Sequence, residues 1–238
     1  MSQQVNTLGQ PVGPSHNDWV ARPKPPTTTL AGRFCRDEKL LPHKHGADLF
    51  AANQLDKQGR NWTYLGVGPF ETADTYHAWL TSVAPGQDPL FHAIVDQASG
   101  KAVGVASLMR IDPANGVIEV GHINYSPLLQ GKPHATEAMF LLMGRVFDEL
   151  GYRRYEWKCD SLNAPSRAAA LRYGFRYEGE FRQAVVYKGR SRDTTWFSII
   201  DSEWPAIKAA YQAWLDPSNF DAVGQQRRKL ANFMPKQA

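Results

Sequence analysis

Apolar residues along the chain fall into short runs separated by turn residues. Such runs cover residues 90–96, 102–111 and 117–125, and turn-forming residues fill 99–100 and 112–116 between them. Short apolar runs bounded by Gly, Pro, Asn and Asp are typical of strands joined by tight turns. The three runs therefore predict a three-stranded antiparallel meander.

The apolar period changes after residue 130. Side chains spaced three and four residues apart predict one long helix, and they are Met139, Leu142, Met143, Val146 and Leu150. Gly151 follows where a helix cap is expected, and 155–159 then alternates as a strand. With strand 117–125 this helix and strand predict a β-α-β unit whose two strands run parallel. A ligand crevice is expected at the carboxyl ends of such strands.

The remaining pattern predicts shorter elements around this unit. They are strands at 28–36, 177–187 and 194–200, and helices at 44–54, 72–82, 165–173 and 204–215. Residues 1–27 are proline-rich and predict an extended arm, attached to the body by Trp19 and Val20. The domain itself is expected at 28–201. Residues 202–238 then predict a C-terminal helix followed, beyond Phe220, by a solvated tail with a basic run at 227–229.

Composition narrows the class of protein. With 238 residues, 42% of them hydrophobic, the chain suffices for one catalytic domain with a substantial core. The formal net charge of +4 suits a polyanionic cofactor, but dense basic blocks are lacking, so no nucleic acid is expected as partner. Cys35 and Cys159 form no C-x-x-C pair, which indicates neither a disulfide framework nor a zinc site. His43 and His45 lack helical ligand spacing, so we expect surface histidines and no metal.

The sequence also limits where the protein works. Residues 1–14 lack the basic start and apolar run of a secretory signal, and no apolar stretch is long enough to span a bilayer. We therefore expect a cytoplasmic protein without a membrane partner. Both a monomer and a homodimer are compatible with the sequence.

The segment between strand 117–125 and the long helix carries the clearest chemical signal. It reads Gln130-Gly131-Lys132-Pro133-His134-Ala135-Thr136-Glu137-Ala138. A turn at a helix start offers unpaired N–H donors and the positive end of the helix dipole, which together hold phosphates. No Walker P-loop and no G-x-G-x-x-G follows any predicted strand, which argues against nucleoside triphosphates and nicotinamide cofactors.

In this segment the sequence resembles the GNAT acetyltransferases, in particular the branch of ribosomal-protein N-terminal-alanine acetyltransferases. Residues 130–135 resemble the family loop Q/R-x-x-G-x-G/A, and 135–138 match the A-T-E-A start of the next helix in that branch. Asn163-Ala164-Pro165-Ser166 with Gly174-Phe175 is similar to the family's N-x-x-S…G-F segment. Residues 177–182, with Gly189-Arg190 and Asp193, resemble its closing hairpin.

The resemblance implies both a fold and an activity. The implied fold is α/β (α+β): a central mixed, largely antiparallel sheet of about 6–7 strands, with helices on both faces and the parallel β-α-β unit splayed at an acyl-CoA site. The implied reaction moves an acetyl group from acetyl-CoA to a primary amine, of a protein N-terminus or a small molecule, by direct attack in a ternary complex. The alternative is a non-catalytic acyl-CoA-binding or interaction module on the same scaffold.

The resemblance also implies which residues hold the coenzyme. The expected set is Asn124, Tyr125, Gln130, Gly131, Lys132, Pro133, His134, Ala135, Thr136, Asn163 and Ser166. Pro133 replaces the loop's central glycine and has no N–H, so one phosphate donor is missing, although proline suits the first turn of a helix. Asn163 is either the asparagine that binds the pantetheine arm or a plain N-cap of the next helix.

Attack on a thioester requires a neutral amine, and hence a base. Glu119 is our first candidate, because the resemblance implies a carboxylate on this strand and because an apolar flank of Val117, Val120 and Ile123 favours a raised pKa. A salt-bridged strand glutamate is the alternative. His122 ranks second, because strict alternation puts it on the opposite face of the strand unless a bulge intervenes.

The general acid for the leaving thiolate is open. The position at which many GNAT enzymes carry a tyrosine reads as Ala170, which leaves Ser166 as a candidate. Tyr173 is expected to pack in the core beside Phe175, and transfer without a dedicated acid is also compatible with the sequence.

The acceptor groove is expected between the loop 58–69 and the hairpin 182–193. Trp62 and Tyr64 either line it or cover the edge of the core. Three arginines nearby, Arg60, Arg182 and Arg190, favour an acidic acceptor if they face the groove, and otherwise belong to solvated surface.

Overall fold

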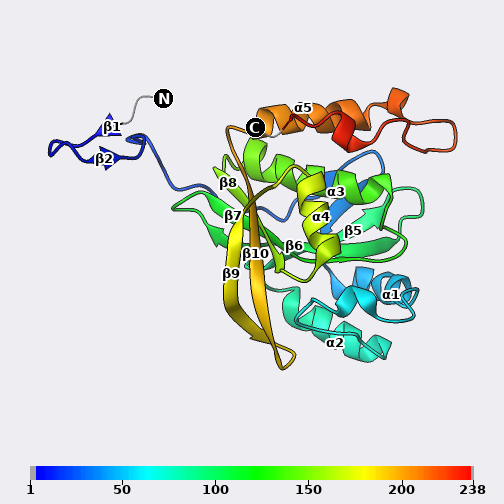
Figure 1. Ribbon diagram of the computed structural model, residues 1–238. Helices are drawn as coiled ribbons and strands as arrows, with labels where there is room; N and C mark the ends of the chain where they lie inside the picture. The colour runs from blue at the N-terminus through cyan, green and yellow to red at the C-terminus, as the bar shows by residue number, and fades with distance from the viewer. Residues whose placement is uncertain (1–3, 237–238) are drawn as a thin grey trace.

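A computed structural model describes residues 4–236, and its centre is one eight-stranded sheet (Figure 1). In sheet order the strands are β3 (Leu30–Ala31), β4 (Cys35–Lys39), β5 (Leu90–Asp96), β6 (Ala102–Asp112), β7 (Val117–Tyr125), β8 (Arg154–Asp160), β10 (Arg190–Ile200) and β9 (Arg176–Tyr187). All neighbours pair antiparallel except β7 and β8. The predicted meander, the parallel pair and the closing hairpin are therefore confirmed.

Helices cover both faces of this sheet, as expected. In Figure 1 the helices α1 (Pro42–Asn53) and α2 (Ala73–Val83) lie below it, and α3 (Pro133–Gly144) and α5 (Trp204–Leu215) lie above it. A π-helical turn, Arg145–Glu149, extends α3, and α4 (Ala164–Arg172) follows β8. Short 3-10 turns occupy Arg60–Trp62, Pro217–Asn219 and Leu230–Asn232. Each face of the sheet has its own buried apolar cluster, which explains why the inner strands are apolar on both sides.

The parallel strands β7 and β8 separate before either one ends. Their pairing stops at Val120 and Trp157, whereas β7 continues to Tyr125 and β8 continues to Asp160. The far ends of both strands therefore leave backbone groups without a strand partner between them. This is the splay that the resemblance implies.

The prediction of one strand over 28–36 is wrong, and the sheet has eight strands because this segment forms two. A turn at Gly32 and Arg33 separates β3 from β4 and wraps the carboxylate of Glu137, which comes from α3. Three backbone amides donate to that carboxylate, from Arg33 at 2.7 Å, Phe34 at 2.6 Å and Cys35 at 2.8 Å. A side chain at Gly32 would collide with the same carboxylate at 2.4 Å.

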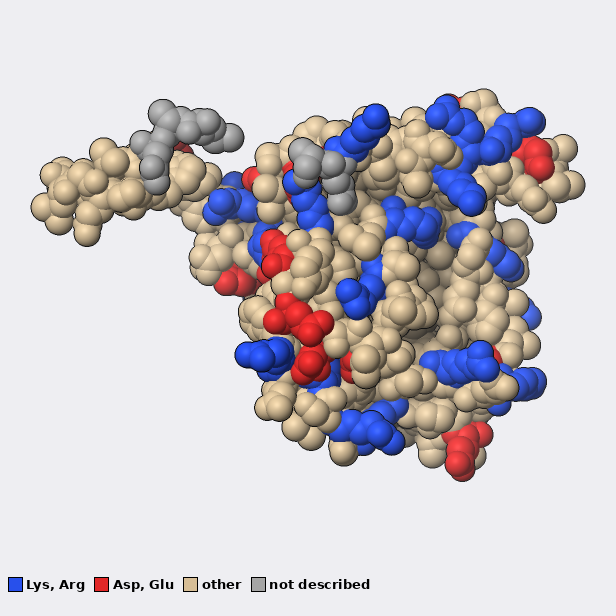
Figure 2. Space-filling view, in the orientation of Figure 1, with Lys and Arg blue, Asp and Glu red and all other residues tan. Residues whose placement is uncertain are grey.

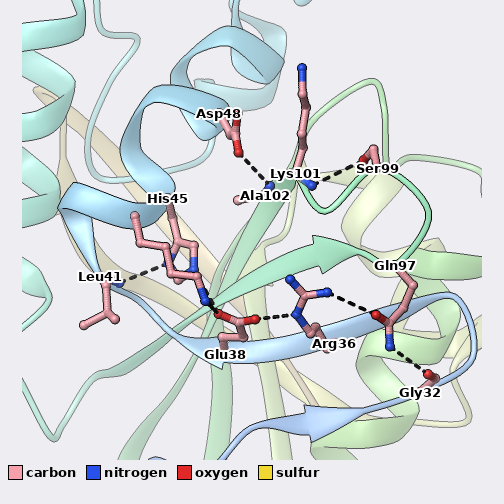
Figure 3. Close-up of polar contacts among 11 residues, drawn as sticks. Gly32, Arg36, Glu38, Leu41, His45, Asp48, Gln97, Ser99, Lys101 and Ala102 are labelled. Carbon is pink, nitrogen blue, oxygen red and sulfur yellow. Dashed lines mark hydrogen bonds and ion pairs between the residues drawn. The ribbon is translucent and has the colours of Figure 1, made fainter.

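The junction between β4 and α1 is held by a carboxylate with three cationic or polar partners (Figure 3). Glu38 pairs with Arg36, with Lys44 and, at 3.2 Å, with Nε2 of His45. The Leu41 amide donates to Nδ1 of His45 at 3.1 Å, so this imidazole caps the helix start. The expectation of two surface histidines is wrong for His45, which is buried, and right for His43.

The N-terminal arm carries a small ribbon that stands away from the body in Figures 1 and 2, formed by β1 (Gln4–Val5) and β2 (Pro11–Val12). Of the two expected attachments, Trp19 makes one: its indole N–H donates to the Ala114 carbonyl at 2.7 Å. Val20 is 63% exposed and makes none.

The C-terminal segment packs on the body more than its polar sequence predicts. Beyond Phe220 we expected a solvated tail, but Leu230 is only 2% exposed and belongs to the core cluster under α3 and α5. No helix among residues 4–236 is both long and apolar enough to cross a membrane. On the face drawn in Figure 2, Lys and Arg are interspersed with Asp and Glu instead of forming one block.

Candidate active site

Two neighbouring cavities open where β7 and β8 separate. The first, of about 470 Å³, lies at the start of α3, and the second, of about 620 Å³, lies between the strand ends. A third hollow of about 1080 Å³ shares Asp160, Phe181 and Ala184 with the second, so the space continues outward along the hairpin β9–β10.

The first cavity collects most of the residues predicted for the coenzyme. Those present are Tyr125, Gln130, Gly131, Lys132, Pro133, Ala135 and Thr136. The remaining walls, which the sequence did not indicate, come from α4 and the C-terminal segment: Pro165, Ala168, Ala169, Arg172, Tyr173, Trp214 and Gln226. The expected core packing of Tyr173 is also confirmed, since this side chain is 3% exposed.

The turn before α3 provides the phosphate donors that its sequence predicts. Pro133 is the first residue of α3, so its missing N–H falls where a helix has no internal acceptor anyway. Among the described residues, no protein group accepts from the amides of Gly131 and His134. Gly131 has a φ of 71°, which turns successive amides toward one side. The cavity thus fits a pyrophosphate despite the proline.

Three predicted coenzyme residues point their side chains elsewhere. The His134 imidazole turns toward Asp96, with Nε2 at 3.3 Å from Oδ1, so only its amide faces the turn. The Asn124 side chain is buried and is not part of either cavity wall. The Gln130 side chain donates to the Tyr125 carbonyl at 2.7 Å and to Asn61 at 2.8 Å. The Gln130 and His134 side chains brace the loop, and what all three residues offer a ligand is their backbone.

The second cavity brings together the predicted catalytic residues. Glu119 and His122 come from β7, and Asn163 and Ser166 come from the start of α4. Strict alternation would place His122 on the far face, but β7 carries an extra residue between its pairings with Ser107 and Val105. His122 adopts a φ of 48° at this bulge, which turns its side chain into the same cavity as Glu119.

Glu119 does not have the apolar surroundings that we expected. Its carboxylate lies 2.9 Å from Nη1 of Arg110 and 2.8 Å from Nζ of Lys158. Arg110 reaches it because β6 has a bulge of its own at this point, with Arg110 at a φ of 47°. The alternative of a salt-bridged strand glutamate therefore describes this residue.

The His122 imidazole is hydrogen-bonded to the Ser107 hydroxyl. The Ser107 oxygen lies 3.1 Å from the Gly121 carbonyl and 3.1 Å from Nδ1 of His122, so Nδ1 is the N–H donor when the hydroxyl proton points to the carbonyl. Nε2 then carries the lone pair. Burial, and with it the charge of Arg110, lowers the pKa of His122 below its ordinary value of 6.5. At neutral pH the cavity therefore contains an uncharged nitrogen base.

Hydroxyl groups and an amide line the other side of the second cavity. The Ser166 hydroxyl accepts from the Trp157 indole at 3.0 Å, which leaves its own proton free to donate. Asn163 caps α4 through Oδ1, which accepts from the Ser166 amide at 3.1 Å, and its NH₂ group remains for a ligand. Both readings of Asn163 are thus compatible with its geometry. Ala170 is fully buried and takes no part in the site.

Sequence reasoning missed Tyr187, whose hydroxyl lies at the edge of the second cavity. It donates to Oδ2 of Asp160 at 2.8 Å, and burial together with Asp160 raises the pKa of Tyr187 to about 12. The tyrosine expected on a helix is absent, whereas this one arrives from strand β9. Nothing in the local sequence marks Tyr187 as a site residue. The sequence indicated only that it belongs to the closing hairpin.

The residues expected at an acceptor groove lie in different places. Tyr64 lines the second cavity, and its hydroxyl donates to the Leu162 carbonyl at 3.1 Å. Trp62 is 4% exposed and belongs to the core cluster beside α2, so it covers the core edge. Arg182 lines the outer hollow, whereas Arg60 and Arg190 line none of these cavities.

The fold and the site together indicate a transferase that binds a phosphate-containing cofactor. The sheet separates one parallel strand pair, free amides lie at the start of α3, and an uncharged histidine lies in the gap. The family model described as the acetyltransferase (GNAT) domain matches residues 40–176, more than half of the 238 residues. The chain belongs to this family and is a GNAT N-acetyltransferase, as its motifs predict.

Solved structures and a curated relative agree with this. A GCN5-related N-acetyltransferase from Brucella melitensis is 54% identical, covers 92% of this chain and 99% of its own, and superposes with a TM-score of 0.89. A probable acetyltransferase of the GNAT family from Chromobacterium violaceum is 41% identical over 83% and 98% of the two chains, with a TM-score of 0.76. The ribosomal-protein-serine acetyltransferase of Escherichia coli is 28% identical over 62% of this chain and 80% of its own length.

Proposed function

We propose that this acetyltransferase moves an acetyl group from acetyl-CoA to the primary amine at the N-terminus of a protein, by direct attack in a ternary complex. The observation that carries the proposal is the β7–β8 splay, which has the uncharged His122 on one side and the Ser166 hydroxyl on the other. Neither Cys35 nor Cys159 serves as an acyl carrier, since burial raises the pKa of both thiols.

The coenzyme would occupy both cavities. Its pyrophosphate fits the amides of Gly131 and His134, and its pantetheine arm fits the gap between β7 and β8, beside the free NH₂ group of Asn163. Bound acetyl-CoA supplies the activated acetyl thioester. The chain's own residues then have to orient the amine, take its proton and provide a proton for sulfur.

His122 fits the role of base better than Glu119 does. Nε2 of His122 has a free lone pair, whereas the Glu119 carboxylate is engaged by Arg110 and Lys158. His122 takes one proton from the acceptor ammonium, and the neutral nitrogen bonds to the acetyl carbon as the carbon–sulfur bond breaks. The departing sulfur accepts a proton from the Ser166 hydroxyl, and the second proton of the acetylated nitrogen, passed directly or through water, restores that hydroxyl. In this scheme Glu119 positions Arg110 and Lys158.

A protein N-terminus is favoured over a small amine by the shape of the outer hollow. The second cavity continues into a wide open trough along β9–β10, lined by Asp160, Arg182 and Asp193 among others. A closed pocket would suit a small metabolite, whereas an open trough admits a chain that extends away from its terminal amine. The Escherichia coli relative is named for acetylating a ribosomal protein at serine, which supports the same class of acceptor.

The place of action that we propose is the cytoplasm. Cys35 and Cys159 are both free and buried, which suits a reducing compartment. A small-molecule amine stays the second candidate acceptor, and a non-catalytic acyl-CoA-binding module is the alternative function.

The test measures release of free thiol from acetyl-CoA with peptides that begin with serine or alanine, the same peptides with blocked N-termini, and a panel of small amines. His122→Gln is expected to lower kcat about 10²–10³-fold, as loss of a general base does, and to leave acetyl-CoA affinity within about twofold. Glu119→Gln is expected to lower kcat by about tenfold or less, since it removes a positioning carboxylate. His77→Gln, on the exposed face of α2, is the matched control and should behave as wild type.

Three results would contradict the proposal or a part of it. Thiol release with small amines but with no free-terminus peptide would reassign the acceptor. Coenzyme binding without turnover on any amine would favour the non-catalytic module. A larger loss in Glu119→Gln than in His122→Gln would return the role of base to Glu119.

A further inference from the structure

The coenzyme cavity has a wall that comes from outside the family domain. The family match ends at residue 176, yet Trp214, near the end of α5, and Gln226, in the following loop, both line the cavity at the start of α3. Ala168, Ala169 and Arg172 of α4 line the same cavity. The C-terminal segment thus provides part of the wall of a cavity that contains none of Glu119, His122 and Ser166.

The loop that forms this wall is held in place by several hydrogen bonds. Trp214 donates from its indole to Oε1 of Gln226 at 2.8 Å. The buried Asn219 side chain donates to the Trp214 carbonyl at 2.9 Å and to the Arg228 carbonyl at 3.2 Å, and accepts from the Arg228 amide at 3.0 Å. A bridge between Phe220 and Gln226 closes the loop. Because Oε1 of Gln226 is already used, its NH₂ group remains free to donate to a ligand.

Arg172 of α4 provides a positive charge in the same cavity. Its guanidinium donates from Nη2 to the Thr136 hydroxyl at 3.0 Å and lies over the Tyr173 ring at 4.4 Å from the centroid. Both contacts hold the guanidinium beside the first turn of α3, where the phosphate-binding amides lie. An arginine with its plane fixed in this way is suited to bind a phosphate group with two parallel hydrogen bonds.

We propose that Trp214 and Gln226 form a clasp over the nucleoside end of the coenzyme, and that Arg172 binds its ribose 3′-phosphate. The proposal rests on the proposed function for the place of the pyrophosphate. Ala168 and Ala169 line the same cavity and offer apolar contacts for the purine ring, and the Gln226 NH₂ group is left to donate to it.

The first experiment compares coenzyme A with 3′-dephospho-coenzyme A by titration calorimetry. The two ligands differ only in the phosphate assigned to Arg172. Wild type is expected to bind coenzyme A about tenfold more tightly than the dephospho form, as one charge-assisted phosphate contact provides. Arg172→Gln is expected to bind both ligands equally. Lys208→Gln, which also removes one positive charge but on the outer surface of α5, is expected to keep the tenfold preference.

The second experiment tests the clasp. Gln226→Ala and Trp214→Phe are each expected to weaken both ligands by about threefold to tenfold, because they open the wall without touching the phosphate contact. Gln225→Ala changes the neighbouring exposed side chain and is expected to bind as wild type. Coenzyme A is also expected to change the tryptophan fluorescence of wild type, and Trp214→Phe to lose that change. Thermal melting of each variant shows that it is folded before it is titrated.

The outcomes separate this inference from the proposed function. If Arg172→Gln keeps the full preference for the 3′-phosphate, or Gln226→Ala binds both ligands as wild type does, the clasp is wrong and the acetyltransferase proposal stands. If wild type binds neither ligand, both proposals fall.

Discussion

The position of His122 follows from its neighbours in sequence. Gly121 precedes it, and a side chain at 121 would place its Cβ 2.2 Å from the sulfur of Met109 on β6. Glycine therefore leaves room for the Met109 side chain beside the extra residue of β7. The bulge turns a histidine that simple alternation assigns to the opposite face into a wall residue of the second cavity.

The pH dependence of turnover should report His122. A base works only when it is unprotonated, and the pKa of His122 lies below 6.5. We therefore expect kcat/KM with a peptide acceptor to rise with pH below 6.5 and to show no further rise from this group above it. In His122→Gln the rise should be absent, because glutamine does not titrate. A rise that persists unchanged in the variant would assign it to another group.

Glu38 should make the protein sensitive to acid. Burial alone would raise the pKa of Glu38, but hydrogen bonds from Lys44, Arg36 and His45 outweigh burial and lower it from 4.5 to about 2. A carboxyl whose pKa is lower in the folded than in the unfolded chain stabilises the fold above pH 4.5, and this contribution disappears as the pH falls from 4.5 to about 2.

Glu38→Gln is therefore expected to lower the free energy of unfolding by about 2 kcal/mol at pH 7, and by much less near pH 2. Urea titrations of both proteins across this range measure the difference. Glu71→Gln, an exposed carboxyl outside the cluster, is the control. A difference that does not depend on pH would show that Glu38 acts by packing.

At the scale of secondary structure, local patterns predicted most of the elements correctly. The meander, the helix after residue 130 and the parallel strand depend on periods within ten or so residues, and these are visible in the sequence. The break between β3 and β4 is not visible in the local sequence, because it depends on Glu137, about a hundred residues away. The same holds in the site: the turn 130–136 was predictable, whereas the cations around Glu119 come from a β6 bulge and from β8.

The turn between β3 and β4 should therefore depend on the Glu137 carboxylate. Glu137→Ala leaves the three amides of residues 33–35 without their acceptor, and a buried donor that loses its partner is costly. We expect a loss of about 2–4 kcal/mol in the free energy of unfolding, measured by urea denaturation. A loss below about 0.5 kcal/mol would mean that water replaces the carboxylate at no cost.

At the scale of the whole molecule, the extensions on both sides of the family domain are attached through buried polar residues. Asn219 holds the C-terminal loop, and Arg145 holds the arm: its guanidinium donates to the Pro26 carbonyl at 2.8 Å and to the Thr28 carbonyl at 3.0 Å. The division into an arm at 1–27, a domain at 28–201 and a C-terminal segment at 202–238 stays our proposal. The C-terminal segment shares the core of the domain through Phe220 and Leu230, whereas the arm is held at its base by hydrogen bonds.

Removing the Arg145 anchor should free the arm. Arg145→Met keeps the length of the side chain but loses the contacts with Pro26 and Thr28. We expect thermolysin, which cleaves before apolar residues, to cut before Val20 and Leu30 several-fold faster than in wild type, because cleavage requires the segment to leave the surface. Mass spectrometry of the early fragments identifies the sites. Equal rates in both proteins would show that Trp19 alone keeps the arm in place.

The early end of the β7–β8 ladder has a consequence for hydrogen exchange. Beyond Val120, the amides of β7 that face β8 have no strand carbonyl to protect them, although they lie in the centre of a well-packed sheet. In deuterated water they should exchange much faster in the free protein than the amides of β5, which is paired with a strand on each side. A ligand lying between the strands would slow the exchange of these amides. The amides that are slowed would then show, one peptide group at a time, where the ligand lies.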